Sequence, residues 1–405
     1  MERYNKLPSR EQLLEETEGM EFPVKKVNGH FHTPYSFSAF DSLDQVMEMA
    51  DNEEVDVLGI NDFYTTAGYD EFAELCEKYR KFPLFNIEFM GLLKEEQATG
   101  IRVNDPNNPG RTYFSGKGLD YPVSLEGSSL EKLNSVRTES DRQTREMVEK
   151  ASEHLTAIDP DLAIDYDEIL ENFTRGMVRE RHIAKVIRTK VYEKYDTKAA
   201  RKEILEKIYV GKSSTADISD PVAVDGEIRS MLLKAGGVAF VKENPKAFLQ
   251  IPEVIRIIID AGGIPCYPVL LDDKNGNYTE YEANKETLYE RLTDMNVWSL
   301  ELIPGRNRHQ NLRTFVEFFD KRGFVITFGT EHNTPALDPL TVSAADAELD
   351  AYLQKVSYEG ACITAAHQYM RSRGEKGYVD EQGMPSPDRN SFIRLGNSII
   401  NHFVK

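Results

Sequence analysis

The stretch that decides the fold is residues 26–40, KVNGHFHTPYSFSAF, which carries two histidines separated by one residue. The apolar residues around them predict a strand that enters a loop. Because successive side chains of a strand point to opposite faces, His30 and His32 would share one face, about 6.5 Å apart along the strand. Two imidazoles placed in this way can converge on a metal ion, and a strand end with two hydrogen-bonded histidines is the alternative.

Side chains that can bind metals also end the other predicted strands. VDVLGIND ends at Asp62, NIEF places Glu88 at the end of the next strand, and TFGTEH ends the last strand with Glu331 and His332. In a β/α barrel the carboxyl ends of the strands meet at one mouth, where active sites lie. Histidine and carboxylate ligands suit Zn, Mn or Fe, which can activate water or polarise a phosphoryl oxygen.

Strand and helix patterns alternate in two separate parts of the chain, which predicts a parallel sheet or a β/α barrel built from residues 21–91 and 235–340. Residues 92–125 are rich in Pro, Gly and Asn, so an irregular loop is expected there. The charged sequence that follows has mostly helical patterns. We therefore predict that residues 92–234 form a helical insertion, or lid, beside the barrel, and that residues 341–405 form a helical tail.

The composition limits the partners of the protein. The 405-residue chain has a net charge of -19, which disfavours nucleic acids and anionic membrane surfaces. Three widely spaced cysteines argue against a disulfide framework, and residues 1–20 lack the apolar core of a signal peptide. No apolar run is long enough to span a membrane. We expect a cytoplasmic protein that binds a small molecule, and the sequence gives no oligomeric state.

These motifs resemble, in the same order, those of the PHP (polymerase and histidinol phosphatase) superfamily. NGHFHTPYS is similar to the family's opening H-x-H-T-x-x-S, VDVLGINDF to a motif that usually ends T-D-H, and NIEF to the motif with a bridging Glu. IIDAGGIPCYP is similar to a segment that usually ends A-H-P, FGTEHNTP to a last motif G-S-D-x-H, and RERHIAKVI to R-x-H-x-A in phosphoesterases with a helical insert. The resemblance covers roughly residues 24–91 and 235–338.

The resemblance implies an α/β fold, a distorted (β/α)7 TIM-like barrel of PHP type with a helical insertion. It also implies divalent metal ions, here one to three of Zn, Mn or Fe. The ligands that it indicates are His30, His32, Glu88, Glu331 and His332. Many members of the family hydrolyse phosphate esters. The expected activity is therefore that of a metal-dependent phosphoesterase, which uses metal-activated water on a small phosphorylated substrate.

Further roles follow from the same positions. Glu88 is expected to bridge metal ions, and Asp62 is a second acidic candidate for catalysis. Tyr267 stands where the A-H-P histidine would be, and it could act as a hydrogen-bonding group or general acid, or pack at the barrel mouth. The candidates for substrate binding are Arg181, His182 and Arg306. The alternative for His182 is a histidine packed in the lid, and the alternative for Arg306 is a salt bridge in a loop.

The chain also departs from the family pattern. Phe63 stands where the family has a metal-binding histidine, the last motif is one residue short, and Glu180 falls where the arginine of the insert belongs. These departures keep two alternatives open. One is a catalytically degenerate PHP-like protein that binds a ligand or a partner through a polar pocket without metal. The other is a metal-dependent hydrolase that acts on a non-phosphate bond.

Overall fold

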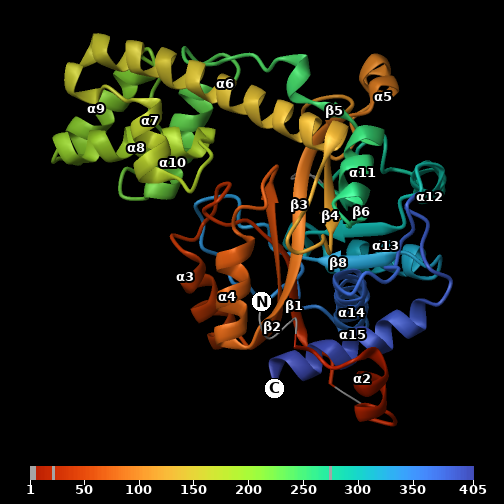
Figure 1. The fold of residues 1–405 in the computed structure, drawn as a ribbon. Coiled ribbons are helices and arrows are strands. Elements are labelled where there is room, and N and C mark those ends of the chain that lie inside the picture. The colour runs from red at the N-terminus through yellow and green to blue at the C-terminus, as the bar shows by residue number, and fades with distance from the viewer. Residues whose placement is uncertain (1–5, 21–22, 273–275) are drawn as a thin grey trace.

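The computed structural model describes residues 6–20, 23–272 and 276–405. Its strands are β1 Lys26–Phe31, β2 Val55–Phe63, β3 Phe82–Leu92, β4 Arg111–Lys117, β5 Leu249–Gln250, β6 Ile264–Val269, β7 Ser299–Leu302 and β8 Val325–Phe328. They form one eight-stranded sheet, which curls into a nearly closed barrel in the order β1-β2-β3-β4-β6-β7-β8, while β5 pairs with β3 beside this path (Figure 1). The predicted barrel is confirmed, although residues 21–22 of its expected first segment lie outside the described residues.

The barrel closes between its first and last strands. β4 is antiparallel to β3 and β6, and the other neighbours along the barrel are parallel. Beyond the end of β8, the backbone N–H of His32 donates to the carbonyl of Glu331 at 2.8 Å, and the N–H of Glu331 donates to the carbonyl of His30 at 2.9 Å. Histidines from the start of the sheet therefore lie beside a carboxylate from its end.

The strand β4 corrects the expectation of an irregular loop over residues 92–125. It pairs Ser115 with Glu88 of β3 on one side and with Cys266 of β6 on the other, so it lies inside the barrel wall. The strand was not predicted because many Pro, Gly and Asn residues precede it, although most of its side chains are buried. This strand brings Lys117 into the barrel.

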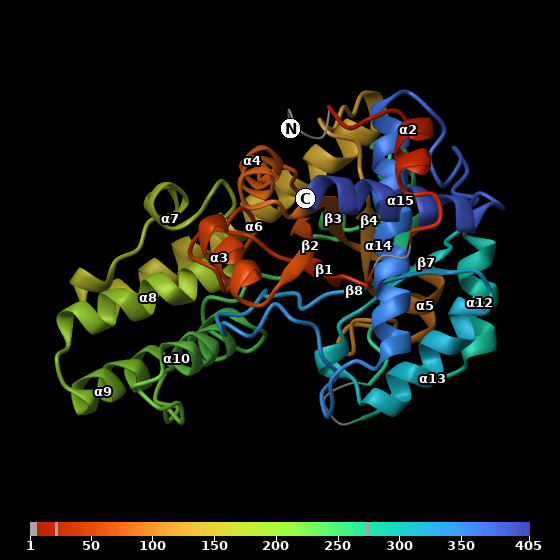
Figure 2. The ribbon, with the colours of Figure 1, turned by 90° about the horizontal axis from the view of Figure 1, so that it is seen from below.

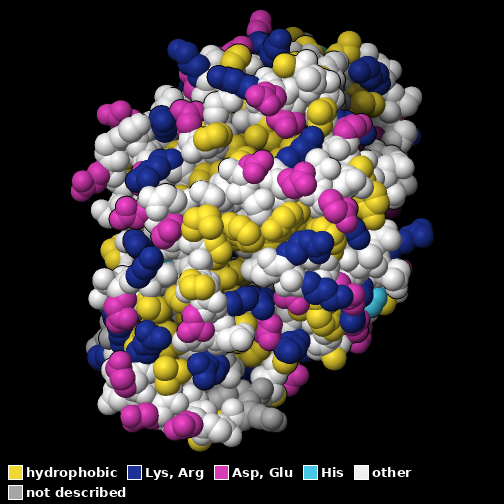
Figure 3. Space-filling model, turned by 90° about the vertical axis from the view of Figure 1, so that its right-hand side faces the viewer, with side chains coloured by type: hydrophobic (Ala, Val, Ile, Leu, Met, Phe, Trp, Pro, Cys, Tyr) yellow, Lys and Arg dark blue, Asp and Glu magenta, His cyan; other side chains and the backbone are white. Residues whose placement is uncertain are grey.

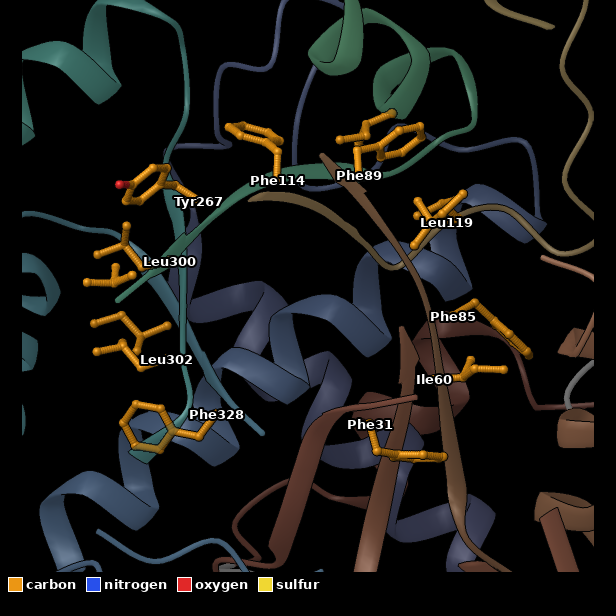
Figure 4. Packing of buried hydrophobic residues seen from close by; sticks show 14 of the residues in the cluster. Phe31, Ile60, Phe85, Phe89, Phe114, Leu119, Tyr267, Leu300, Leu302 and Phe328 are labelled. Atoms are coloured by element: carbon orange, nitrogen blue, oxygen red, sulfur yellow. The ribbon is translucent and has the colours of Figure 1, made fainter. Parts of the chain in front are cut away.

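Apolar side chains of the strands point outward onto a layer of helices. Figure 4 shows Tyr267, Leu300, Leu302 and Phe328 on the outer side of their strands. Because side chains alternate along a strand, Glu301 between the two leucines points into the barrel. The surrounding helices are α3 Leu43–Asn52, α4 Tyr69–Tyr79, α11 Ile251–Asp260, α12 Lys285–Asp294 and α13 His309–Asp320, and a short helix α5 covers Lys94–Thr99.

A group of helices projects from the barrel as a cap (Figure 1). It consists of α6 Gly127–Ile158, α7 Tyr166–Phe173, α8 Glu180–Lys194, α9 Lys198–Ile208 and α10 Pro221–Ile228. The long helix α6 begins beside the barrel and runs out into the cap. The cap has its own apolar core, which includes Met147, Ile183, Leu205 and Leu232. The cap therefore packs around side chains of its own while α8 begins near the barrel mouth.

The C-terminal helices cover the end of the barrel opposite the predicted metal ligands. These helices are α14 Ala351–Ser372 and α15 Arg389–Val404, and the N-terminal helix α2 Arg10–Glu16 packs against α15 (Figure 2). Their apolar residues join Val57, Phe82 and Val325, which lie at the beginnings of their strands. Acidic and basic side chains intermingle on the face shown in Figure 3. Among the described residues, no helix combines the length and the apolar character needed to cross a membrane.

Candidate metal centre

Three predicted ligands meet inside the mouth of the barrel. His30 and His32 come from the end of β1, and Glu88 comes from β3. Their nitrogen and oxygen atoms lie within 4.8 Å of one another, and all three residues are buried. The two Nε2 atoms are 3.3 Å apart, and His32 Nε2 lies 3.1 Å from Glu88 Oε2. Two donors that bind the same zinc ion at about 2.1 Å would be separated by roughly 3.4 Å, so this spacing fits one ion.

The neighbouring groups fix the tautomers of both histidines. His30 Nδ1 lies 2.8 Å from Glu301 Oε1, and an ionised carboxylate only accepts, so Nδ1 carries the proton. Ser36 Oγ donates to Asp62 at 2.6 Å, which leaves that oxygen to accept from His32 Nδ1 at 3.2 Å. In both rings the Nε2 atom therefore holds a lone pair.

This arrangement fits a metal ion better than it fits a purely hydrogen-bonded cluster. Two Nε2 lone pairs and Glu88 Oε2 face one another, and that oxygen accepts no hydrogen bond within the described part of the chain. Buried electron pairs that face each other repel unless a cation or a proton lies between them. Burial lowers the pKa of His32 to about 4 and also lowers the pKa of His30, so neither ring supplies a second proton at neutral pH.

A buried polar layer lies under His30 and consists of Glu301, Lys117 and Asn61. None of these three residues was predicted from the sequence as part of the site. Lys117 makes an ion pair with Glu301, and their side chains are only 2% and 1% exposed. Asn61 Oδ1 lies 3.4 Å from Lys117 Nζ, and Asn61 Nδ2 lies 3.1 Å from His30 Nδ1 and 3.2 Å from His30 Nε2. The signal in the sequence is an isolated Glu in the apolar run VWSLELIP. Carboxylates in this position orient metal-binding histidines.

Glu88 and Glu301 have opposite electrostatic surroundings. Burial raises the pKa of Glu88 to about 7, although nearby His30 and Lys117 oppose the rise. Burial would also raise the pKa of Glu301, but His30 and Lys117 outweigh it and lower the value to about 2. Glu301 is therefore a permanent anion with its own cation, whereas Glu88 is the carboxylate that still needs a positive partner.

Two of the three donor residues, His30 and Glu88, line a cavity of about 690 Å³. Arg306, Tyr113 and Asn104 line it together with His30 and Glu88. Burial lowers the pKa of Arg306, which nevertheless stays a cation because an arginine side chain is effectively always protonated. Burial raises the pKa of Tyr113 to about 12, so its hydroxyl keeps its proton at neutral pH. The cavity thus joins a candidate metal site to a cationic group and a hydrogen-bond donor.

The structure does not bring Tyr267 to this cavity. Its side chain lies on the outer face of β6, as that of Leu300 lies on the outer face of β7 (Figure 4). The hydroxyl donates to Glu282 at 2.8 Å, and both residues are buried. Side chains alternate along a strand, so the inward positions next to it are Cys266 and Pro268. The proposed replacement of the missing histidine by Tyr267 is wrong for this geometric reason.

Glu331 and His332 separate after β8. Both have left-handed backbone conformations, with φ of 69° and 49°. Glu331 lines the cavity and pairs with Arg306. The His332 ring turns away, with Nδ1 at 2.6 Å from Thr330 Oγ1 and Nε2 at 2.8 Å from the carbonyl of Asp338. The structure therefore places His332 outside the cluster of His30, His32 and Glu88, contrary to expectation.

Asp62 lies behind His32 and does not line the cavity. It accepts from the backbone N–H of Thr33 at 2.8 Å, from Thr33 Oγ1 at 2.6 Å and from Ser36 Oγ at 2.6 Å. These bonds fix the turn after β1. Through Ser36 they also orient the His32 ring, so the geometry gives Asp62 a positioning role and not the direct catalytic role expected from the sequence.

The cap contributes Arg179 and not Arg181 or His182. Phe63 stacks on the His32 ring at 4.8 Å, and the Arg179 guanidinium lies 5.0 Å from the centre of the Phe63 ring. Arg181 lies over Phe37 instead. His182 is buried, with its Nδ1 accepting from the backbone N–H of Arg179 at 3.0 Å. Because α8 begins at Glu180, the residue just before it is the one that faces the barrel mouth.

Comparisons with known proteins agree with this architecture. No family model and no curated protein sequence matches the chain. A crystal structure of a proposed metal-dependent phosphoesterase from Bifidobacterium adolescentis matches with a TM-score of 0.52 and 18% identity, over 83% of this chain and 96% of the other. The two chains therefore share a barrel fold. An amidohydrolase from Chromobacterium violaceum, solved with bound sulfate and no metal, matches at a TM-score of 0.49 and 14% identity, over 82% and 95%.

The fold assignment explains why the site lies where it does. In this barrel the carboxyl ends of the parallel strands open toward the cap, and the C-terminal helices cover the other end. A ligand would therefore approach the donors from the cap side. The similarity at 18% identity shows the fold alone, and the chemistry of the site depends on the residues of this chain.

Proposed function

We propose that this protein is a metal-dependent hydrolase, and specifically a phosphoesterase that acts on a small phosphorylated molecule. The observation that carries the proposal is the convergence of His30 Nε2, His32 Nε2 and Glu88 Oε2, since His30 and Glu88 line a cavity that also holds Arg306. The ions that suit these ligands are Zn, Mn and Fe. A proposed metal-dependent phosphoesterase has the same barrel fold, which is consistent with the proposal.

A metal ion bound there would supply a Lewis acid and lower the pKa of a water ligand. The remaining work falls to the protein. Glu301 accepts the Nδ1 proton of His30 and keeps its Nε2 free to bind the ion. Arg306 and Arg179 would hold the phosphate oxygens with their planar guanidinium groups. Tyr113, which keeps its proton, would donate a hydrogen bond to the substrate.

The test is hydrolysis of a panel of phosphate monoesters by protein loaded with Zn²⁺ or Mn²⁺. We expect turnover that a chelator abolishes and that added metal restores. His32→Ala should lower kcat/KM by more than about 100-fold, since outer-shell partners of a metal already contribute roughly 10–100-fold. Tyr267→Phe is the matched control and should keep kcat/KM within about twofold, because its hydroxyl contacts Glu282 outside the barrel.

Metal-loaded protein that turns over none of the esters would contradict this function. Hydrolysis of amides or carboxylic esters under the same conditions would support the alternative of a metal-dependent hydrolase that acts on a non-phosphate bond. Binding of phosphate esters without turnover would support the alternative of a degenerate ligand-binding protein.

A further inference from the structure

The barrel mouth contains more potential ligands than one ion needs, which raises the question of how many ions it holds. Carboxylate and histidine side chains of the described residues that lie at the mouth or under it include His30, His32, Asp62, Glu88, Glu301, Glu331 and His332. Each ion requires donor atoms that are not already used by a proton or a fixed cation. The number of free donor atoms therefore limits the number of ions.

Both oxygens of Glu301 are used. Oε1 accepts from His30 Nδ1 at 2.8 Å and from Ser115 Oγ at 3.2 Å. Oε2 pairs with the ammonium group of Lys117. The Lys117 side chain is only 2% exposed, so its ammonium group fills the space beside Glu301 where a metal ion could otherwise sit.

The remaining candidates are also used. Arg306 neutralises Glu331. Both nitrogens of His332 are engaged by Thr330 and by the carbonyl of Asp338. Asp62 accepts three hydrogen bonds from Thr33 and Ser36.

We infer that the barrel binds one divalent cation, at His30, His32 and Glu88, and that Lys117 and Arg306 act as built-in cations in place of further metal ions. The other carboxylates named above and His332 offer no free donor atom for a second ion, because Lys117, Arg306 and neighbouring hydrogen-bond partners already engage them. The inference depends on the metal binding in the proposed function and does not depend on turnover.

The experiment is a metal titration of the full-length protein after chelator treatment. Bound Mn²⁺ and Zn²⁺ are counted per chain by elemental analysis, and the Mn²⁺ protein is examined by electron paramagnetic resonance. We expect saturation at one equivalent and the spectrum of an isolated Mn²⁺ ion. A second equivalent of similar affinity, or the spectrum of a spin-coupled pair, would overturn the inference.

Two variants test the assignment of donors. The charge-neutral double variant Lys117→Met, Glu301→Gln should still bind one equivalent, with affinity reduced about 10–100-fold because His30 loses the partner that orients it. His32→Ala should bind none. Loss of one of two wild-type equivalents in the double variant would show that Glu301 is itself a ligand.

The outcomes separate this inference from the proposed function. One equivalent of metal without turnover of any ester would leave the inference standing and remove the phosphoesterase. No bound metal in the wild type would remove both. Turnover with two bound ions would keep the phosphoesterase and remove the inference.

Discussion

At the scale of single residues, the site depends on which atoms of a side chain are still free. His30 and His32 each use Nδ1 for a neighbour and keep Nε2 for a ligand. Glu88 and Glu301 have the same chemistry, yet Lys117 pairs with Glu301 and leaves Glu88 without a positive partner.

The pKa of Glu88 predicts how metal binding depends on pH. Burial raises this pKa to about 7, so below that pH a proton competes with the ion for the carboxylate. We expect the association constant for Zn²⁺ to fall by up to about tenfold for each pH unit below 7 and to level off above it. Isothermal titration between about pH 5.5 and 8.5 measures this dependence.

Glu88→Gln supplies the control for the pH profile. This variant should bind metal weakly at every pH in the range, and its remaining dependence should reflect the histidines alone. Because burial lowers the pKa of His32 to about 4, that dependence should be flat near neutrality. An unchanged slope around pH 7 in the variant would assign the effect to another group.

At the scale of elements, the barrel is held against α14 by close backbone contact. Gly360 of α14 faces β8, and a Cβ added there would overlap the carbonyl oxygen of Ile326. The same helix contacts α15 through Gly396, where an added Cβ would overlap Cys362. Larger residues at either position would push the helix away from the strands and uncover the end of the barrel.

We therefore predict that Gly360→Ala lowers Tm, with a cost of about 1–3 kcal/mol from overpacking. The matched control is Gly226→Ala in α10, where an added Cβ meets no atom of the described chain within 4 Å. That change should be neutral or should stabilise by roughly 0.5–1 kcal/mol, because alanine is the better helix former. Thermal unfolding followed by circular dichroism compares the two, and equal Tm values would contradict the close packing.

At the scale of the whole molecule, the proposed site for an anion lies in a strongly acidic protein. The net charge of -19 repels a phosphorylated molecule at long range, so the cavity needs a local positive field. Arg306 comes from the barrel, and Arg179 comes from the cap. The cap thus adds a second positive charge, that of Arg179, to the barrel mouth.

We predict that Arg179→Ala raises KM for a phosphate ester by about 10-fold or more and changes kcat less, because the lost contact binds charge in the ground state as well. Arg142→Ala in α6 is the control, since its ion pairs with Glu139 and Glu146 are exposed. Steady-state kinetics of both variants decides the question. Equal KM values would show that the cap does not hold the substrate.

Local pattern determined much of this protein. The sequence predicts the alternation of strands and helices and the strand ends that carry the possible ligands, because periodicity and caps are properties of short segments. It also predicts that His30 and His32 share one face of their strand. Ser42 illustrates this, since its side chain accepts from the backbone N–H of Gln45 and caps α3. The resemblance of the motifs to those of a known family also predicted the barrel.

Tertiary structure alone decided which side chains meet. Lys117 and Glu301 lie 184 residues apart, and Lys117 stands in a strand that the local composition hides. Tyr267 faces outward because of strand parity, and His332 turns away because two successive residues adopt left-handed conformations. Contacts of this kind depend on strand register and chain direction over long separations, which no local pattern in a single sequence encodes.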